Sequence, residues 1–390
     1  MHSHPIEFIF PNDLNGIAWT IMIVLYPYIT GLVAGAFVVA ALYHVFGKKE
    51  LAPVARFALA ASFSFCAFAT TPLLLHLHQP QRALYIMFMP NPTSAMAGFG
   101  FIYSFYLVLL LVEILLVFRS DIVALALKER GLKKLLYRAM ALGVLRETAK
   151  SQALDAQWVH ILSVVGIPAA CVLHGYVGFI FGGIKANPWW STALMPVIFL
   201  CSAIVSGVAM LVVLYVTACT LRRIAVDDAC LRSMLRTLWL FLILAVTLEM
   251  LELLNMAYEA GQEWHMLSQL MTDKLRTSFF QVQLLLGSAI PFLLLAYAMR
   301  QDTPAGRRRW IGVVSAMLVL LQVLAMRFNV VIGGQLLSKS FRGFNTFELE
   351  WHGREGLIAA LIVFALPFVL LTALSKILPV WKTDASHPAP

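Results

Sequence analysis

Side chains that can give and recover a proton stand near the ends of several apolar runs in this sequence. The segment VLHGYVGFIFGGIKANPWW, residues 172–190, carries His174 and Tyr176, while Tyr26, His76 and His78 lie in or beside two earlier runs. Histidine and tyrosine each donate and accept hydrogen bonds, which suits proton-coupled chemistry. His174 and Tyr176 are two residues apart, about 200° around a helix, so they cannot both face one ligand. We expect one to touch a ligand and the other to hold a neighbouring helix; packing histidines and interfacial tyrosines are the alternative.

A quinone is one ligand that such residues could serve. Its two carbonyls take up two electrons and two protons, and its site must be mostly apolar, near the membrane edge, with a donor for each carbonyl. Haem is the other candidate, because His160 and His174 are 14 residues apart and nearly share one helix face. A stacked pair of haems needs a second such spacing, but Ser62 stands 14 residues before His76. Two haems are therefore excluded, whereas a single haem between His174 and His76 stays open.

Ionisable residues inside apolar runs are functional candidates, because each costs roughly 2.5–3.5 kcal/mol to place in a bilayer. The stretch TLEMLELL contains Glu249 and Glu252, three residues apart and so on one helix face. Arg327 lies in a later run. Counted from the start of each run at about 1.5 Å per residue, Glu252 and Arg327 both lie about 25 Å deep. We expect an Arg327–Glu252 ion pair, with Glu249 as a proton relay; separate structural hydrogen bonds are the alternative.

The composition defines the environment of these residues. Of the 390 residues, 61% are hydrophobic and 13% are charged, and the mean hydropathy is +0.82. Soluble domains are roughly half apolar and about a quarter charged, so this is a polytopic membrane protein. The five cysteines have no CxxC spacing, and no Walker motif, Rossmann fingerprint or hydrolase signature occurs. The chain is therefore expected to bind no metal of its own.

Nine apolar runs are long enough to span a bilayer as helices. They lie at roughly 17–46, 52–75, 97–118, 158–183, 193–220, 236–258, 278–299, 310–332 and 356–379. No cleavable signal peptide is expected, because the N-terminus has no basic region and the first run is too long. The predicted fold is all-α: one integral membrane domain over residues 1–390. Its first bundle, at about 17–183, is expected to hold the quinone site, and its second bundle lies at about 193–379.

The positions of Lys and Arg predict the orientation in the membrane. The loops after the first, third, fifth and seventh runs and the C-terminal end hold 21 of the 29 Lys and Arg residues, and the opposite side holds 7. Because positive loops stay in the cytoplasm, the N-terminus is expected in the periplasm and the C-terminus in the cytoplasm. This asymmetry explains the net charge of +9 without nucleic acid. Residues 119–157 mix Leu with Lys and Arg at helical spacing, which predicts an amphipathic cytoplasmic loop on the inner surface.

Four stretches resemble one known family. They are PYITGLVAGAFVVAALYHVF in the first run, MPNPTSAMAGFG entering the third, GIPAACVLHGYVGFIFGGIKANPWW in the fourth, and RFNVVIGGQLLSKSFRGF after the eighth. Spread over nearly the whole chain, they are similar to the NrfD family, typified by the membrane subunit of polysulfide reductase. The resemblance implies a quinone-reactive subunit of an oxidoreductase complex in the bacterial inner membrane, active in anaerobic respiration. It would bind menaquinone or ubiquinone near the outer face and exchange electrons with a ferredoxin-like iron–sulfur subunit docked there, beside a molybdopterin or multihaem cytochrome subunit.

The resemblance also implies roles for single positions. Aligned on NPWW, Tyr176 takes the place of the family's quinone-contacting tyrosine, with His174 supporting it or relaying its proton. Aligned on TGLVAG, Tyr26 stands where the family has a histidine, and His76 stands where it often has an acid before a proline and an arginine. Two rival functions remain. A secondary transporter is disfavoured because the polar groups gather at the outer helix ends rather than at the midplane. The other rival is a passive anchor for soluble redox subunits.

Overall fold

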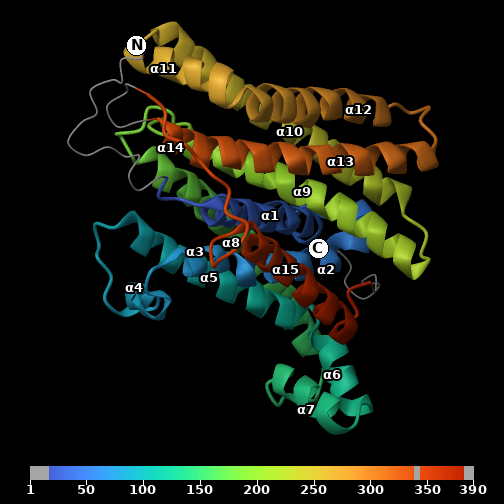
Figure 1. The fold of residues 1–390 in the computed structure, drawn as a ribbon. Coiled ribbons are helices and arrows are strands. Elements are labelled where there is room, and N and C mark those ends of the chain that lie inside the picture. The colour runs from blue at the N-terminus through green and yellow to red at the C-terminus, as the bar shows by residue number, and fades with distance from the viewer. Residues whose placement is uncertain (1–16, 338–342, 382–390) are drawn as a thin grey trace, which may run out of the picture.

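The computed structural model describes residues 17–337 and 343–381 (Figure 1). In this part of the chain all regular elements are helices, and nine helical stretches are long and apolar enough to cross a membrane. The prediction of an all-α, nine-span membrane protein is thereby confirmed. Both chain termini lie outside the described residues, as do Lys339, Arg342 and Lys382 from the charge count.

The elements follow one another as an up-and-down series of helices. The long helices are α1 (Ile21–His44), α2 (Ala52–Phe68), α5 (Ala95–Val117), α8 (Ala149–Gly182), α9 (Met195–Arg222), α10 (Asp228–Glu259), α13 (Ala305–Phe328) and α15 (Leu357–Ile377). The short ones are α3 (Thr71–His76), α4 (Tyr85–Phe88), α6 (Arg119–Lys128), α7 (Gly131–Met140), α11 (Gln262–Gln269), α12 (Ile290–Ala298) and α14 (Gly334–Leu336). Two 3₁₀ turns lie at Lys49–Leu51 and Pro80–Arg82, and π-helical segments at Leu270–Lys274, Arg276–Ala289 and Asn329–Gly333.

Several helices continue beyond the predicted apolar runs. Hydropathy marks only the part of a helix that lies in lipid, whereas the helix itself ends where its backbone groups are capped. α8 begins at residue 149 rather than 158, because the Thr148 hydroxyl accepts from the Ser151 N–H (3.1 Å) and the Ser151 hydroxyl pairs with the Thr148 N–H (3.0 Å). α10 begins at 228 rather than 236, where the Asp227 carboxylate accepts from the Cys230 N–H (2.9 Å).

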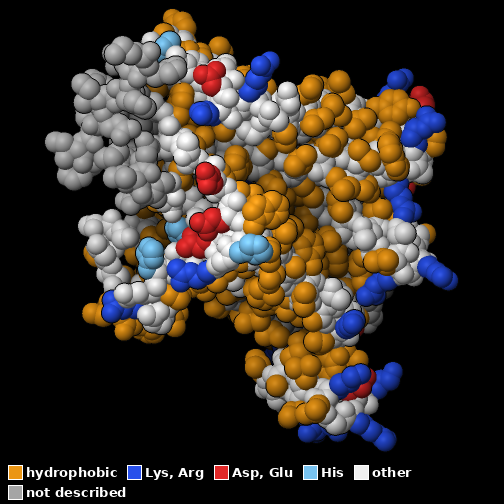
Figure 2. Space-filling model, in the orientation of Figure 1, with side chains coloured by type: hydrophobic (Ala, Val, Ile, Leu, Met, Phe, Trp, Pro, Cys, Tyr) orange, Lys and Arg blue, Asp and Glu red, His pale blue; other side chains and the backbone are white. Residues whose placement is uncertain are grey.

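The two ends of the bundle differ in charge. One end, called the N-terminal face below, carries the start of α1, the end of α3, the end of α8 and the start of α15; it lies on the left in Figure 1. The other end, called the basic face, carries the ends of α1, α9 and α15 and the start of α13. Blue Lys and Arg side chains gather along the basic face at the right of Figure 2. The N-terminal face is the one that the charge distribution predicts to lie outside.

α1 and α9 form the centre of the protein and are its two most buried spans. α2, α5 and α8 pack on one side of this pair, and α10, α13 and the segment Arg276–Ala298 pack on the other (Figure 1). α15 packs mainly on α2, so the last helix lies beside the first group although it comes last in sequence.

Glycines let the two central helices meet backbone to backbone. A Cβ placed on Gly35 of α1 would lie 2.3 Å from the carbonyl oxygen of Ile204 and 2.6 Å from the Cα of Gly207 in α9. A Cβ on Gly207 would in turn lie 2.5 Å from the Gly35 nitrogen. Small residues at such crossings allow close van der Waals contact, which drives helix association where lipid removes the hydrophobic advantage. The TGLVAG stretch is therefore a packing element.

The loop after α5 forms a separate arm. α6 and α7 pack against each other and project sideways from the bundle near the basic face (Figure 1). Leu127, Leu132 and Leu135 of the arm are exposed. Hydrophobic side chains gather on one side of the arm, and Lys and Arg side chains extend from the other (Figure 2). The Tyr137 hydroxyl donates to the carbonyl of Ile377, 2.9 Å away, and ties the arm to the end of α15. The predicted amphipathic loop at 119–157 thus consists of two short helices followed by the first residues of α8.

Candidate functional site

Tyr176 lies on α8, six residues before the helix ends at Gly182, or about 9 Å from that end along the axis. The side chain is half-buried, and its ring contacts Phe179, with 5.2 Å between ring centroids. The hydroxyl rests against Gly98 of α5, where an added Cβ would lie 2.2 Å from the Tyr176 Oη. No described residue forms a hydrogen bond with this hydroxyl, so its proton is available to a ligand.

Tyr26 reaches the same part of α5 from α1. Its ring meets Phe99, the neighbour of Gly98, edge to face at 5.4 Å. The Tyr26 hydroxyl is fully buried and has no hydrogen-bond partner among the described residues. Unpaired buried hydroxyls are rare in proteins, because each forfeits its hydrogen bonds to water. Tyr26 and Tyr176 are 150 residues apart in sequence, yet both contact α5, at the neighbouring residues Phe99 and Gly98. Neither hydroxyl has a hydrogen-bond partner among the described residues.

His174 faces a different helix from Tyr176, as their two-residue spacing requires. Its Nδ1 lies 2.6 Å from the carbonyl oxygen of Ala170 and its Nε2 lies 2.6 Å from that of Thr30 in α1, one turn after Tyr26. A neutral imidazole has one N–H and donates to one of these carbonyls, whereas an imidazolium donates to both. The ring also meets Tyr106 edge to face at 6.5 Å. His174 therefore joins α8 to α1 within the cluster formed by Tyr26, His174 and Tyr176, called the tyrosine–histidine cluster below.

His76 lies apart from this cluster, at the N-terminal face. Its Nδ1 is 2.6 Å from the Glu355 Oε2, and the same oxygen accepts from the Thr20 hydroxyl at 3.0 Å. A pocket of about 240 Å³ adjoins this contact and is lined by Ile17, Thr20, Ile21, residues 346–350 and Glu355. Both ring nitrogens of His174 face carbonyls and His76 holds a carboxylate, so this geometry gives no support to a haem between the two histidines.

Arg327 does not form the predicted ion pair with Glu252. The guanidinium is 1% exposed; its Nη2 donates to the Ser202 hydroxyl at 2.7 Å and to the Phe199 carbonyl at 3.3 Å, both in α9. It also lies over the Phe199 ring, 3.8 Å from the centroid. Among the described residues, no carboxylate oxygen lies within the 4.0 Å of an ion pair. Equal depth fixes the position along a helix but not the direction in which a side chain points, and α13 turns Arg327 toward α9.

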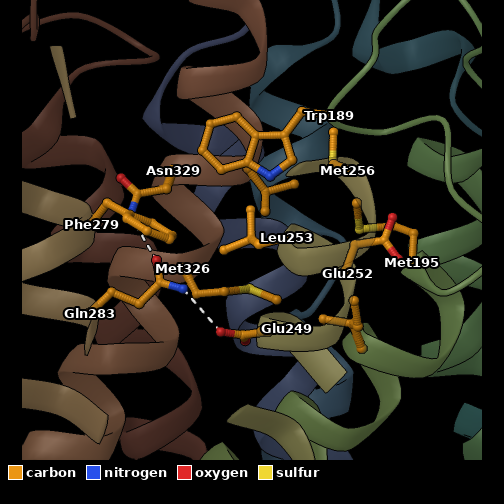
Figure 3. Close-up of a pocket in the computed structure, with 12 residues that line it drawn as sticks. Trp189, Met195, Glu249, Glu252, Leu253, Met256, Phe279, Gln283, Met326 and Asn329 are labelled. Atoms are coloured by element: carbon orange, nitrogen blue, oxygen red, sulfur yellow. Dashed lines mark hydrogen bonds between the residues drawn. The ribbon is translucent and has the colours of Figure 1, made fainter. Parts of the chain in front are cut away.

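Glu249 belongs to a polar chain in the second group of helices (Figure 3). The Gln283 amide donates to the Glu249 Oε2 at 3.0 Å, and the Asn329 amide donates to the Gln283 Oε1 at 2.7 Å. These side chains line a pocket of about 40 Å³, to which Glu252, Met326 and Trp189 also contribute. Gln283 and Asn329 were not predicted from the sequence, although amides inside apolar runs are a visible signal.

Glu113 was not predicted either. This residue of α5 is 0% exposed, and its Oε1 accepts from the Ser163 hydroxyl of α8 at 2.5 Å. Its second oxygen has no hydrogen-bond partner in the described part of the chain. The rule that ionisable residues in membrane spans are functional candidates applies to Glu113 as much as to Glu249.

These features define a class: an integral membrane protein with nine candidate helical spans in the described part of the chain. Two tyrosine hydroxyls without a partner among the described residues and one hydrogen-bonded imidazole lie in the half of the bundle nearest the N-terminal face. The chain belongs to the NrfD family, since the family profile described as Polysulphide reductase, NrfD matches residues 10–338. The resemblance seen in the four stretches is thereby confirmed.

Two relatives carry the names of reductase subunits, and a third is named Protein NrfD. The C subunit of selenate reductase from Mesobacillus selenatarsenatis is 26% identical over 393 residues, which cover 96% of this chain and 90% of the relative. A putative dimethyl sulfoxide reductase membrane subunit of Halobacterium salinarum is 26% identical over 333 residues, covering 85% and 71%. Protein NrfD of Escherichia coli is 26% identical over 200 residues, covering 50% and 59%.

Proposed function

We propose that this chain is the membrane subunit of a respiratory reductase complex in the bacterial inner membrane. It binds menaquinol or ubiquinol at the tyrosine–histidine cluster and exchanges electrons with a ferredoxin-like iron–sulfur subunit at the N-terminal face. The third component of the complex is a molybdopterin or multihaem cytochrome subunit. Membership of the NrfD family and the reductase names of two relatives support this function.

The observation that carries the proposal is that Tyr26 and Tyr176, each with an unused hydroxyl, contact the neighbouring residues Phe99 and Gly98 of α5. Tyr26 and Tyr176 offer two donors in an apolar setting, which matches the two carbonyls of a quinone head. The absence of a side chain at Gly98 leaves room for the Tyr176 hydroxyl itself, which lies 2.2 Å from where a Cβ would stand. The residues present thus fit a quinone.

The chemistry divides between the ligand and the chain. A bound quinol supplies two electrons and two protons on oxidation. Tyr176 and Tyr26 hold and orient the head through their hydroxyls, and each hydroxyl can accept a proton as it gives one up. A proton on either nitrogen of His174 meets a backbone carbonyl, so this ring can carry a second proton without losing a hydrogen bond. Phe99 and Phe179 exclude water around the two tyrosines.

Replacing Tyr176 by phenylalanine tests the site. Phenylalanine keeps the ring and its contact with Phe179, so assembly should change little. The variant loses a hydrogen bond that strengthens as charge develops on the ligand oxygen, and turnover should fall about 10²-fold or more. The measurement is quinol-dependent reduction of the partner subunit in membranes, with subunit levels determined in parallel.

Tyr258→Phe is the matched control, because Tyr258 is 88% exposed near the end of α10 and lies outside the cluster. It should turn over at the unchanged rate. Unchanged turnover in Tyr176→Phe at normal subunit levels would place the quinone elsewhere. If changes at Tyr26 and His174 were silent as well, a passive anchor would replace the proposal.

A further inference from the structure

The polar chain of Glu249, Gln283 and Asn329 has no part in the function proposed above. It lies in the second group of helices, and its three members come from α10 and two π-helical segments (Figure 3). π-helical turns inside membrane helices are uncommon and occur often at functional sites. Gly287 lets one of these segments approach α13 closely, since an added Cβ would lie 2.3 Å from the Gln322 Cβ.

The two outer members of this polar chain, Glu249 and Asn329, each have an unused acceptor oxygen, and a pocket lies beside them. The Glu249 Oε1 and the Asn329 Oδ1 are buried and have no hydrogen-bond partner among the described residues. Glu249 is 8% exposed and borders the pocket of about 40 Å³. One water needs roughly 10–15 Å³ of such space, so the pocket has room for water beside the carboxyl group. A buried carboxyl with one free oxygen and a water-sized space is equipped to bind a proton.

Arg327 supplies the charge that acts on this carboxyl. Its guanidinium is buried against α9 without a carboxylate within 4.0 Å in the described ranges. Its neighbours Met326 and Asn329 line the pocket beside Glu249, and its guanidinium contacts Ser202 of α9, the helix that packs against α1. In a low-dielectric interior an electrostatic interaction extends well beyond hydrogen-bond distance. The positive charge of Arg327 can therefore act on ionisable side chains in both groups of helices.

We propose that Glu249 and the pocket beside it form a proton-binding site that responds, through Arg327, to charge in the tyrosine–histidine cluster. A hydronium ion in the pocket gives its proton to the Glu249 carboxylate, leaving water and a neutral carboxylic acid, and release is the reverse. Negative charge arriving in the cluster offsets Arg327 and favours uptake; its departure favours release. The link to the cluster rests on the proposed function, whereas proton binding by Glu249 does not.

Few other groups compete for this role. Apart from α10, the pocket is lined by apolar side chains and two amides, from α9, the segment Arg276–Ala289, α13, the segment Asn329–Gly333 and Trp189. The one further carboxyl among the described lining residues is Glu252 of α10. Glu252 is half-exposed and forms no hydrogen bond with the chain of amides. Its replacement by glutamine is a second reference for the experiment.

Infrared titration of the purified, quinone-free protein tests proton binding directly. A protonated carboxyl group has a carbonyl stretching band that disappears as the proton leaves. The band that titrates should be absent in Glu249→Gln and present in Glu259→Gln, which changes an exposed carboxyl on the same helix. If Glu249→Gln does not accumulate, Glu249→Asp should keep the band at a shifted position. A band that survives Glu249→Gln but disappears in Glu113→Gln or Glu252→Gln would overturn the proposal.

Arg327 is tested by the same titration. Arg327→Gln removes the positive charge that stabilises the carboxylate, so Glu249 should hold its proton to higher pH, by about tenfold in proton concentration or more. Arg327→Lys keeps the charge and should leave the titration near its original position. An unchanged titration in Arg327→Gln would remove Arg327 from the site.

The link to the cluster has its own readout. Reducing added quinone should produce an infrared difference band that is missing in Glu249→Gln. A protein that titrates at Glu249 but shows no such band, with normal quinol turnover, would refute the link alone. A protein that fails to oxidise quinol would refute the proposed function and leave proton binding by Glu249 standing.

Discussion

Replacing Gly98 by alanine asks whether the position of the Tyr176 hydroxyl controls turnover. The new Cβ would lie 2.2 Å from the Tyr176 Oη and 2.9 Å from its Cζ. Non-bonded heavy atoms settle at about 3.5–4.0 Å, so the hydroxyl must move by about 1 Å or more. The atoms displaced are the far end of a half-buried side chain, which can swing aside without breaking the α5–α8 contact. Folding should therefore survive, while a misplacement of about 1 Å in a reacting group costs about 10²-fold in rate.

The assay is quinol-dependent electron transfer to the partner subunit, at matched subunit levels. Gly100→Ala is the control on the same helix, because its Cβ would meet only Ile86, at 3.3 Å. The double variant Gly98→Ala/Tyr176→Phe sharpens the test. If both changes act through the same hydroxyl, the double variant is no slower than Tyr176→Phe alone. Full turnover in Gly98→Ala, or losses that multiply in the double variant, would show that the reasoning about this hydroxyl is wrong.

Three further predictions concern assembly and orientation. Gly35→Ala places a Cβ 2.3 Å from a backbone carbonyl of α9, which cannot move aside, so the yield of folded protein in membranes should drop sharply. Arg308→Gln removes the buried guanidinium that donates to the carbonyls of Ala298 (3.1 Å) and Thr303 (2.7 Å), and should destabilise the protein by about 1–3 kcal/mol, lowering the melting temperature; the Asp228 carboxylate, which is 36% exposed, keeps Arg232 as a partner. The exposed Arg307→Gln should cost less than about 1 kcal/mol in the same measurement. A topology reporter fused after Pro390 should be active only in the cytoplasm, and one inserted near Asn91 only outside; the opposite pattern would reverse the proposed orientation.

The spans were predictable because bilayer thickness sets a length that hydropathy can measure. The ends of the helices were not: α8 begins at residue 149, before the predicted run, because of a Thr148–Ser151 cap, and α3 begins separately from α2 where Pro72 follows Thr71. Such endings depend on single capping or ring geometries, which an average over about 20 residues conceals.

Within the site, local spacing was informative and long-range pairing was not. The two-residue spacing of His174 and Tyr176 correctly indicated that they point to different helices. The partner of His76 is Glu355, 279 residues later, and no periodicity connects them. The predicted Arg327–Glu252 pair failed because depth along two helices says nothing about rotation around them.

The glycine contact between α1 and α9 has a mechanical consequence. Gly35 and Gly207 lie near the middle of their helices, and their backbones touch with no layer of side chains between them. A contact of this kind acts as a pivot: α1 and α9 stay in contact, while the angle at which they cross can change. A small change of crossing angle leaves the midplane still and produces its largest displacement at the two membrane surfaces. Rocking of one half of the protein against the other would thus displace the N-terminal face and the basic face to a similar extent.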